Sequence, residues 1–403
     1  MGSVVVDQIG PVGELVQAVD TRLSDTQKNR LLLDALPGAL VENYAGERVV
    51  RFGDQILLKK QVTHLGIPWP GFKKRIQIPK RWLEVERRAS ADGLTTRFVG
   101  IYHFDPVTIF VDFDPTTYVR RKANNSAAHV ATNDLYQAQL HGQFSRVDRN
   151  GNRLTSVRAD QFAQYLRRGY VPSHPRINVF RSFNAEFLNV GRLEALSAIK
   201  AMYAASWPDT FQGEWPGFFL EFRLEEFLRT QRLTHVVEYQ KVKGKGLFDY
   251  DLVFSEGGAI AYYGDLKASD VEKRESPGND ADDIRSCVSR YGRFWYVIYE
   301  HETTHARDNH DLATIAWNRW KRSVGYRARK GYDELSYAKR FKESVRFVKM
   351  VILEVNPANF HLVLGEFAQG RQQGGAARAL KVMIKKENID NFLIYSESVG
   401  VAA

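Results

Sequence analysis

The residues of this chain that could do chemistry together lie between positions 248 and 268, in the stretch FDYDLVFSEGGAIAYYGDLKA. Asp249 and Asp251 alternate with apolar residues, so in an extended strand both carboxylates lie on one face; Asp265 and Lys267 share a face in the same way. An acid two positions before a lysine, opposite an acid on a neighbouring strand, suits a metal-dependent phosphodiester hydrolase. Carboxylates bind Mg²⁺ through hard oxygens, while an ammonium group positions water and stabilises charge on the phosphate.

The elements around these residues can bring them to one point. The runs LFDYDLVF and AIAYYGDL predict two strands of a hairpin that turns at residues 256–258. Upstream, PGFFLEFRLEEFLRTQRL has the apolar stripe of a helix, on which Glu221 and Glu225 lie one turn apart. Downstream, NDADDIRSCVSRYGRF predicts a helix and FWYVIYE a buried strand. The order is helix, strand, strand with an acid, strand with acid and lysine, helix, strand.

Residues 214–300 resemble the PD-(D/E)xK nuclease superfamily, which includes most type II restriction endonucleases. The matching pattern is Asp251 followed by Asp265, Leu266 and Lys267. Tyr250 stands where the family often has proline, a common departure. Asp249 lies on the same face as Asp251 and stays an alternative for the first metal ligand.

The resemblance implies a role for each of these residues. Asp251, Asp265 and the backbone carbonyl of Leu266 would bind Mg²⁺, and Lys267 would act on the nucleophilic water. Glu221 occupies the place of the family's helix glutamate, where it would orient the water shell of the metal or Lys267. The resemblance also implies a homodimer that cuts both strands of DNA, and a cognate DNA methyltransferase as functional partner.

From the composition we expect a globular protein without a membrane-spanning segment. Its 403 residues are enough for two or three domains, with 44% hydrophobic and 26% charged residues. We find neither a run of about 20 apolar residues nor a signal peptide, so we expect a cytoplasmic protein. The single Cys287 excludes an internal disulfide and a zinc site built from cysteines.

The positive charge of the chain is concentrated in its first half. The net charge is +10, and residues 56–180 hold 20 lysine and arginine side chains against 9 aspartate and glutamate side chains. This stretch therefore carries slightly more than the whole excess. A basic region of this size indicates a polyanionic partner, for which double-stranded DNA is favoured by the nuclease resemblance.

Two segments supply the candidate DNA-binding residues. In LGIPWPGFKKRIQIPKRW, aromatic residues interleave with cations, which suits phosphate contacts and base stacking but equally suits a loop fixed to the core by its aromatic rings. In YVRRKANNS, arginine and asparagine side chains could read base edges. The candidates are Lys73, Lys74, Arg75, Lys80, Arg81, Arg120, Arg121, Lys122, Asn124 and Asn125.

The predicted fold class is α/β of the α+β kind. We expect an N-terminal α/β DNA-recognition region over 1–182, a helical linker over 183–213, and a nuclease domain over 214–403 with a mixed central sheet flanked by helices. Residues 11–36 predict a helical hairpin with Ser24 or Asp25 as a cap. The segment ELSYAKRFKESVRF predicts an amphipathic helix.

Other functions remain open. His301 to His305 spell HExxH, a zinc-peptidase signature when it lies on a helix. This motif directly follows a strand, however, and its central pair is two β-branched threonines. Further alternatives are an anti-phage or repair nuclease of the same superfamily, and a DNA-binding protein without catalysis, in which the acids and lysine are surface charges. A Mg²⁺-dependent, sequence-specific double-strand DNA endonuclease is the favoured function.

Overall fold

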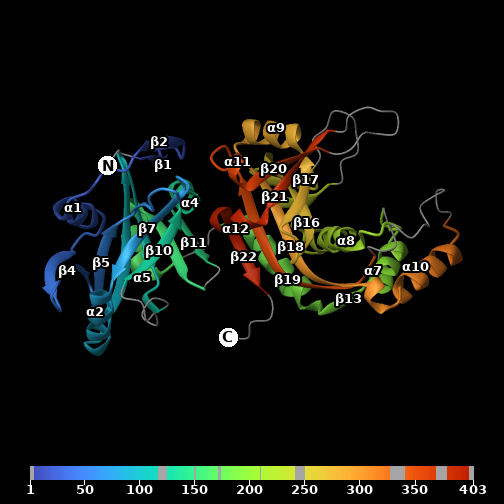
Figure 1. Cartoon of the computed structure of the whole chain (residues 1–403), viewed down its shortest axis with the longest axis horizontal. Coiled ribbons are helices and arrows are strands. Elements are labelled where there is room, and N and C mark those ends of the chain that lie inside the picture. Colours follow the sequence, from blue (N-terminus) through green and yellow to red (C-terminus); the bar gives the residue numbers. More distant parts are fainter. Residues whose placement is uncertain are drawn as a thin grey trace. The chain divides into compact units, whose positions relative to one another are not determined.

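A computed structural model describes residues 4–116, 125–148, 151–170, 174–208, 210–240, 250–326, 341–368 and 379–398. The fold is α+β, with sheets that combine parallel and antiparallel pairs, which confirms the predicted fold class (Figure 1). The chain forms two compact units. The N-terminal unit comprises Met1–Ser173 with Asp390–Ile394, and the C-terminal unit comprises His174–Ile389 with Tyr395–Ala403. The sequence-based linker over 183–213 lies within the second of these units.

The strands of the N-terminal unit are β1 (Val5–Ile9), β2 (Leu15–Val19), β3 (Leu40–Tyr44), β4 (Glu47–Phe52), β5 (Gln55–Gln61), β6 (Thr63–His64), β7 (Lys73–Pro79), β8 (Thr95–Phe104), β9 (Val107–Phe113), β10 (Asn125–Ala131), β11 (Gln143–Val147) and β12 (Arg153–Arg158). Its helices are α1 (Asp25–Ala35), α2 (Lys80–Ala91), α4 (Thr132–His141) and α5 (Phe162–Arg168).

A seven-stranded sheet forms the centre of the N-terminal unit, in the order β11-β12-β9-β8-β5-β4-β3. Helices α1 and α5 pack on it around Leu57, Phe110 and Phe162, which are fully buried. A second sheet has the order β10-β7-β6, and β1 pairs with β2. Burial of apolar side chains on both sides of the central strands supplies most of the driving force for this packing.

The predicted helical hairpin over residues 11–36 is wrong in its first half. Residues Leu15–Val19 form a strand that pairs with β1, because the valine-rich pair completes a hairpin around the turn at residues 10–13. The second half is a helix, and Ser24 is its cap: the Ser24 hydroxyl accepts a hydrogen bond from the backbone N–H of Gln27.

The strands of the C-terminal unit and of the chain's end are β13 (Arg192–Glu194), β14 (Val237–Tyr239), β15 (Leu252–Glu256), β16 (Ala259–Asp270), β17 (Glu275–Asp280), β18 (Phe294–His305), β19 (Lys342–Val355), β20 (Leu364–Ala368), β21 (Leu380–Lys385) and β22 (Leu393–Ser398). The helices are α6 (Pro175–Phe187), α7 (Ala195–Ala204), α8 (Trp215–Thr230), α9 (Ala281–Tyr291), α10 (Leu312–Ser323), α11 (Phe360–Val363) and α12 (Lys386–Phe392).

The central sheet of the C-terminal unit is mixed and has helices on both faces. Its order is β13-β19-β18-β16-β15-β14, with β22 beside β19, and β16 runs parallel to β18. Two rings of α6, Phe183 and Phe187, pack on Tyr299 from one side. On the other side, Tyr291 of α9 packs on Tyr263 of β16. The elements α8, β14, β15, β16, α9 and β18 follow the predicted order of helix, three strands, helix and strand, but the prediction missed β17, which lies between β16 and α9 and pairs with β21 in a separate sheet.

One predicted helix of this unit is wrong where the structure describes it. The end of ELSYAKRFKESVRF is the start of β19, because Lys342–Val355 is a continuous strand paired with β18. Residues 327–340 lie outside the described part of the chain. The antiparallel ladder satisfies the backbone of this segment and buries alternate apolar side chains, which outweighs its local helical pattern.

Candidate functional site

The β15–β16 hairpin positions the predicted acids. Its turn is formed by Gly257 and Gly258, whose φ values of +58° and +82° favour glycine. From this turn the register runs to the pair Leu252 and Gly264. One residue before the strand, the backbone N–H of Asp251 donates to the carbonyl of Gly264 at 3.2 Å. Asp251 is thereby placed at the point where the two strands separate.

A buried carboxylate, that of Asp265, and a half-buried one, that of Asp251, lie together at this point. Asp265 is only 1% exposed, and Asp251 accepts a hydrogen bond on Oδ2 from the backbone N–H of Leu266, with N and O 3.4 Å apart. Burial, followed by the charge of the neighbouring Asp265 carboxylate, raises the pKa of Asp251 well above its usual value. Lys267 contacts Asp265 through Nζ and Oδ2, and its charge opposes this rise. A lysine and two acids therefore share one site.

A glutamate from α8 completes the arrangement. Glu221 accepts a hydrogen bond from the hydroxyl of Tyr239 at 2.6 Å, and its charge also acts on the pKa of Asp251. Tyr239 is the last residue of β14, so the hydrogen bond joins α8 to the sheet beside Asp251. Tyr239 was not among the residues selected from the sequence, where a tyrosine at a strand end carries no sign of its tertiary partner.

The donor set of this site fits a Mg²⁺ ion. Two closely spaced carboxylates, one buried and one half-buried, cannot both ionise easily without a cation, and a divalent ion would supply that charge. Leu266 directs its N–H toward Asp251, and the carbonyl of the same residue in a strand faces the same neighbour. Among the described residues no group of three His, Cys, Asp or Glu side chains could hold a metal. Mg²⁺ often uses only one or two carboxylates and keeps several waters.

The predicted DNA-binding residues are distributed over several elements. Lys73 and Arg75 lie on the more exposed face of β7, and Lys80 and Arg81 are exposed residues at the start of α2. Lys74 is fully buried with Nζ 3.6 Å from Asp20, so its side chain does not face a partner at the surface. Arg120, Arg121, Lys122 and Asn124 lie outside the described residues, and Asn125 begins β10. Asp249, the alternative metal ligand, also lies outside the described residues.

The HExxH motif does not have the form that a zinc peptidase needs. His301 and His305 are the eighth and last residues of β18, an extended strand, so their Cα atoms are roughly 13 Å apart. On a helix the same spacing would place both rings on one face. His301 is fully buried and contacts Thr303 and Lys342.

Comparison with known proteins identified one family for part of the chain. Residues 53–166, within the N-terminal unit, match the family model described as methylase-associated X1. Searches of curated proteins and of solved structures returned no match. No helix in the described ranges has both the length and the apolar character required to cross a membrane.

Proposed function

We propose that this protein is a Mg²⁺-dependent, sequence-specific double-strand DNA endonuclease of the type II restriction enzyme kind. The observation that carries the proposal is the grouping of Asp251, Asp265, Lys267 and Glu221 where α8, β14, β15 and β16 meet. The methylase-associated description of residues 53–166 supports a restriction-modification setting with a cognate DNA methyltransferase. Cutting of both strands calls for two such sites, hence a homodimer.

Each side chain has a chemical task in this proposal. Asp251, Asp265 and the Leu266 carbonyl would hold Mg²⁺, which when bound polarises the phosphate and lowers the pKa of a water. The ammonium of Lys267 is held beside the carboxylates, where it orients the attacking water and stabilises the charge that develops on the phosphate. Glu221 is held in place by its hydrogen bond from Tyr239. In this position it would orient the water shell of the metal or the side chain of Lys267.

The test is digestion of unmodified phage DNA by the purified chain in Mg²⁺ and in EDTA. We expect discrete fragments that require Mg²⁺ and that are lost, by about two orders of magnitude or more in rate, in Lys267→Ala. Glu225→Gln is the matched control, because Glu225 lies one turn along α8 and pairs with Arg229. A smear in place of fragments would indicate a nuclease without sequence specificity. Intact DNA under all conditions, with methylated and unmethylated substrates, would refute the proposal.

A further inference from the structure

The outer face of the β10-β7-β6 sheet has the chemistry of a nucleic-acid surface. Along β7, Lys74, Ile76 and Ile78 are buried, whereas Lys73, Arg75 and Gln77 alternate with them on the opposite face. The ladder places Thr63 and His129 beside Arg75, and Ala127 beside Gln77. None of these six outer positions is acidic. Cations and an amide on a strand face match phosphate oxygens and base edges.

The loop between β6 and β7 presents apolar side chains at the end of this face. Ile67 is 81% exposed and Trp69 is 50% exposed. Lys73 from the outer face lies over the Trp69 ring, with Nζ 5.0 Å from the ring centroid. By contrast, Phe72 and Trp82 of the same basic segment are buried, so they fix the segment to the core. The loop therefore combines buried anchors with an exposed apolar tip beside a cation.

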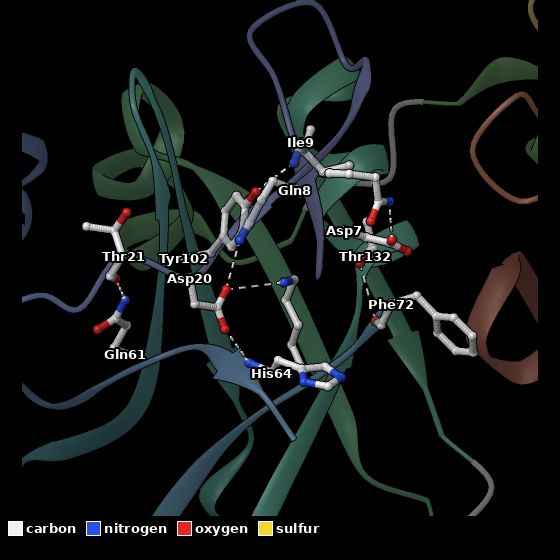
Figure 2. Close-up of polar contacts among 12 residues, drawn as sticks. Asp7, Gln8, Ile9, Asp20, Thr21, Gln61, His64, Phe72, Tyr102 and Thr132 are labelled. Atoms are coloured by element: carbon white, nitrogen blue, oxygen red, sulfur yellow. Dashed lines mark hydrogen bonds and ion pairs between the residues drawn. The ribbon is translucent and has the colours of Figure 1, made fainter. Parts of the chain in front are cut away.

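This tip is held outward by a network at the base of the loop. His64 Nδ1 accepts from the backbone N–H of Gly66 at 3.1 Å, and Nε2 lies 3.0 Å from the carbonyls of Trp69 and Pro70. These contacts fit the neutral ring with its proton on Nε2. Figure 2 shows how the base continues inward: the backbone N–H of His64 donates to Asp20, which also accepts from Gln8. These contacts fix the backbone of the loop in a conformation in which Ile67 and Trp69 are exposed to solvent.

We propose that the Ile67–Trp69 tip inserts into the base stack of duplex DNA while Lys73 and Arg75 bind the flanking phosphates. This inference rests on the DNA substrate of the proposed nuclease. Charge selects the partner: the tip belongs to the stretch that carries the chain's positive excess, and in DNA an apolar base stack lies directly behind a row of phosphates. Isoleucine wedges and aromatic stacking are established ways in which proteins contact bases.

The experiment measures binding and unstacking separately from cleavage. The full chain carrying Lys267→Ala is titrated with labelled random-sequence duplexes, and thymines that it unstacks are mapped with permanganate. We expect Trp69→Ala and Ile67→Ala to weaken binding, Trp69→Ala by about tenfold or more, and to abolish permanganate reactivity. Lys73→Ala should reduce the slope of log K against log salt by about one, whereas Trp69→Ala should leave the slope unchanged.

Leu40→Ala is the matched control, because Leu40 is a 64% exposed apolar residue of the same unit on another edge. Equal melting temperatures of all variants would show that folding is intact. If Trp69→Ala and Ile67→Ala bind like Leu40→Ala and no thymine becomes reactive, the inference is wrong, and a protein partner for the tip becomes the alternative. Absence of duplex binding would also overturn it. If DNA binding depends on the Ile67–Trp69 tip but the protein shows no Mg²⁺-dependent cleavage, only the proposed nuclease activity is refuted.

Discussion

At the scale of single residues, the site's four charged side chains in the described part of the chain do not balance one another in charge. The buried Asp265 lies beside the half-buried Asp251, and the charge of Glu221 also acts on Asp251. Lys267 contributes one positive charge. Such a site favours the binding of a further cation. Without one, the repulsion between the acids lowers the stability of the folded protein.

Divalent cations should therefore stabilise the protein through this site. At a hundred times the dissociation constant, Mg²⁺ or Ca²⁺ should raise the free energy of unfolding by about 2.7 kcal/mol. Asp251→Asn and Asp265→Asn should remove most of this gain, whereas Glu225→Gln should retain it. Thermal denaturation with and without each ion measures the effect. Equal stabilisation of wild type and both asparagine variants would show that the ion binds elsewhere.

His301 gives a separate prediction for acid. Burial, with the Lys342 charge as the next cause, lowers the pKa of His301 to about 3, below its unfolded value of about 6.5. Between these pH values the unfolded chain binds more protons than the folded chain, so stability falls as pH falls. The slope from this group is at most about 1.4 kcal/mol per pH unit.

His301→Gln should flatten that dependence below pH 6.5, since its amide does not titrate. Urea unfolding measured from neutral to acidic pH gives the slope for both proteins. His310→Gln is the control, because His310 is exposed and has no such burial to lose. Parallel curves for wild type and His301→Gln would contradict the prediction.

At the scale of elements, the position of the acids depends on close approach between strands. A Cβ on Gly264 would lie 2.7 Å from both the Phe254 ring and the carbonyl oxygen of Trp295. The same glycine carbonyl accepts the backbone N–H of Asp251. The packing of β16 between β15 and β18 at Gly264 therefore determines where Asp251 lies.

Gly264→Ala should destabilise the protein by about 1–3 kcal/mol and lower cleavage, because a backbone oxygen cannot yield without moving β18. Gly217→Ala on α8 is the matched control: its added Cβ meets nothing within 4 Å, and alanine favours helix, so stability should rise slightly. Denaturant titration compares the two variants. A neutral Gly264→Ala would mean that the strands adjust freely.

At the scale of the whole molecule, the end of the chain contributes to the N-terminal unit. Asp390–Ile394 belongs to that unit, where the ring of Phe392 lies 5.0 Å from that of Phe72 and is nearly inaccessible. Asn133 donates its side-chain amide to the carbonyl of Leu393. A contact between residues more than three hundred positions apart is therefore part of this core.

Phe392→Ala should destabilise the N-terminal unit by about 3–5 kcal/mol, and Phe392→Leu should cost less because it leaves a smaller cavity. Hydrogen exchange resolved by segment should show faster exchange in β7, beside Phe72. We expect α9 and β18 to keep their protection. Loss of protection in those elements alone would contradict the assignment of Phe392 to the N-terminal unit.

The sequence by itself determined the elements with strong local patterns. The hairpin follows from two apolar runs separated by Gly257-Gly258, and α8 follows from its apolar stripe. Helix α9 follows from its acidic first turn and Arg290 near its end, and the first seven residues of β18 follow from a run of aromatic and β-branched residues. Asp265 and Lys267 are two positions apart in a strand, so the sequence also predicted that their side chains lie on the same face. Their catalytic roles stay a prediction that cleavage and cation binding will test.

Only the tertiary structure decided features that depend on distant partners. Leu15–Val19 became a strand because β1 offers a ladder, and Lys342–Val355 because β18 does. Lys74 was buried although its neighbours Lys73 and Arg75 are more exposed, because β7 packs one face against the core. The hydrogen bond from Tyr239 to Glu221 likewise depends on the tertiary structure, because it joins β14 to α8. Local sequence encodes period and turn chemistry, whereas burial and pairing are set by residues far away along the chain.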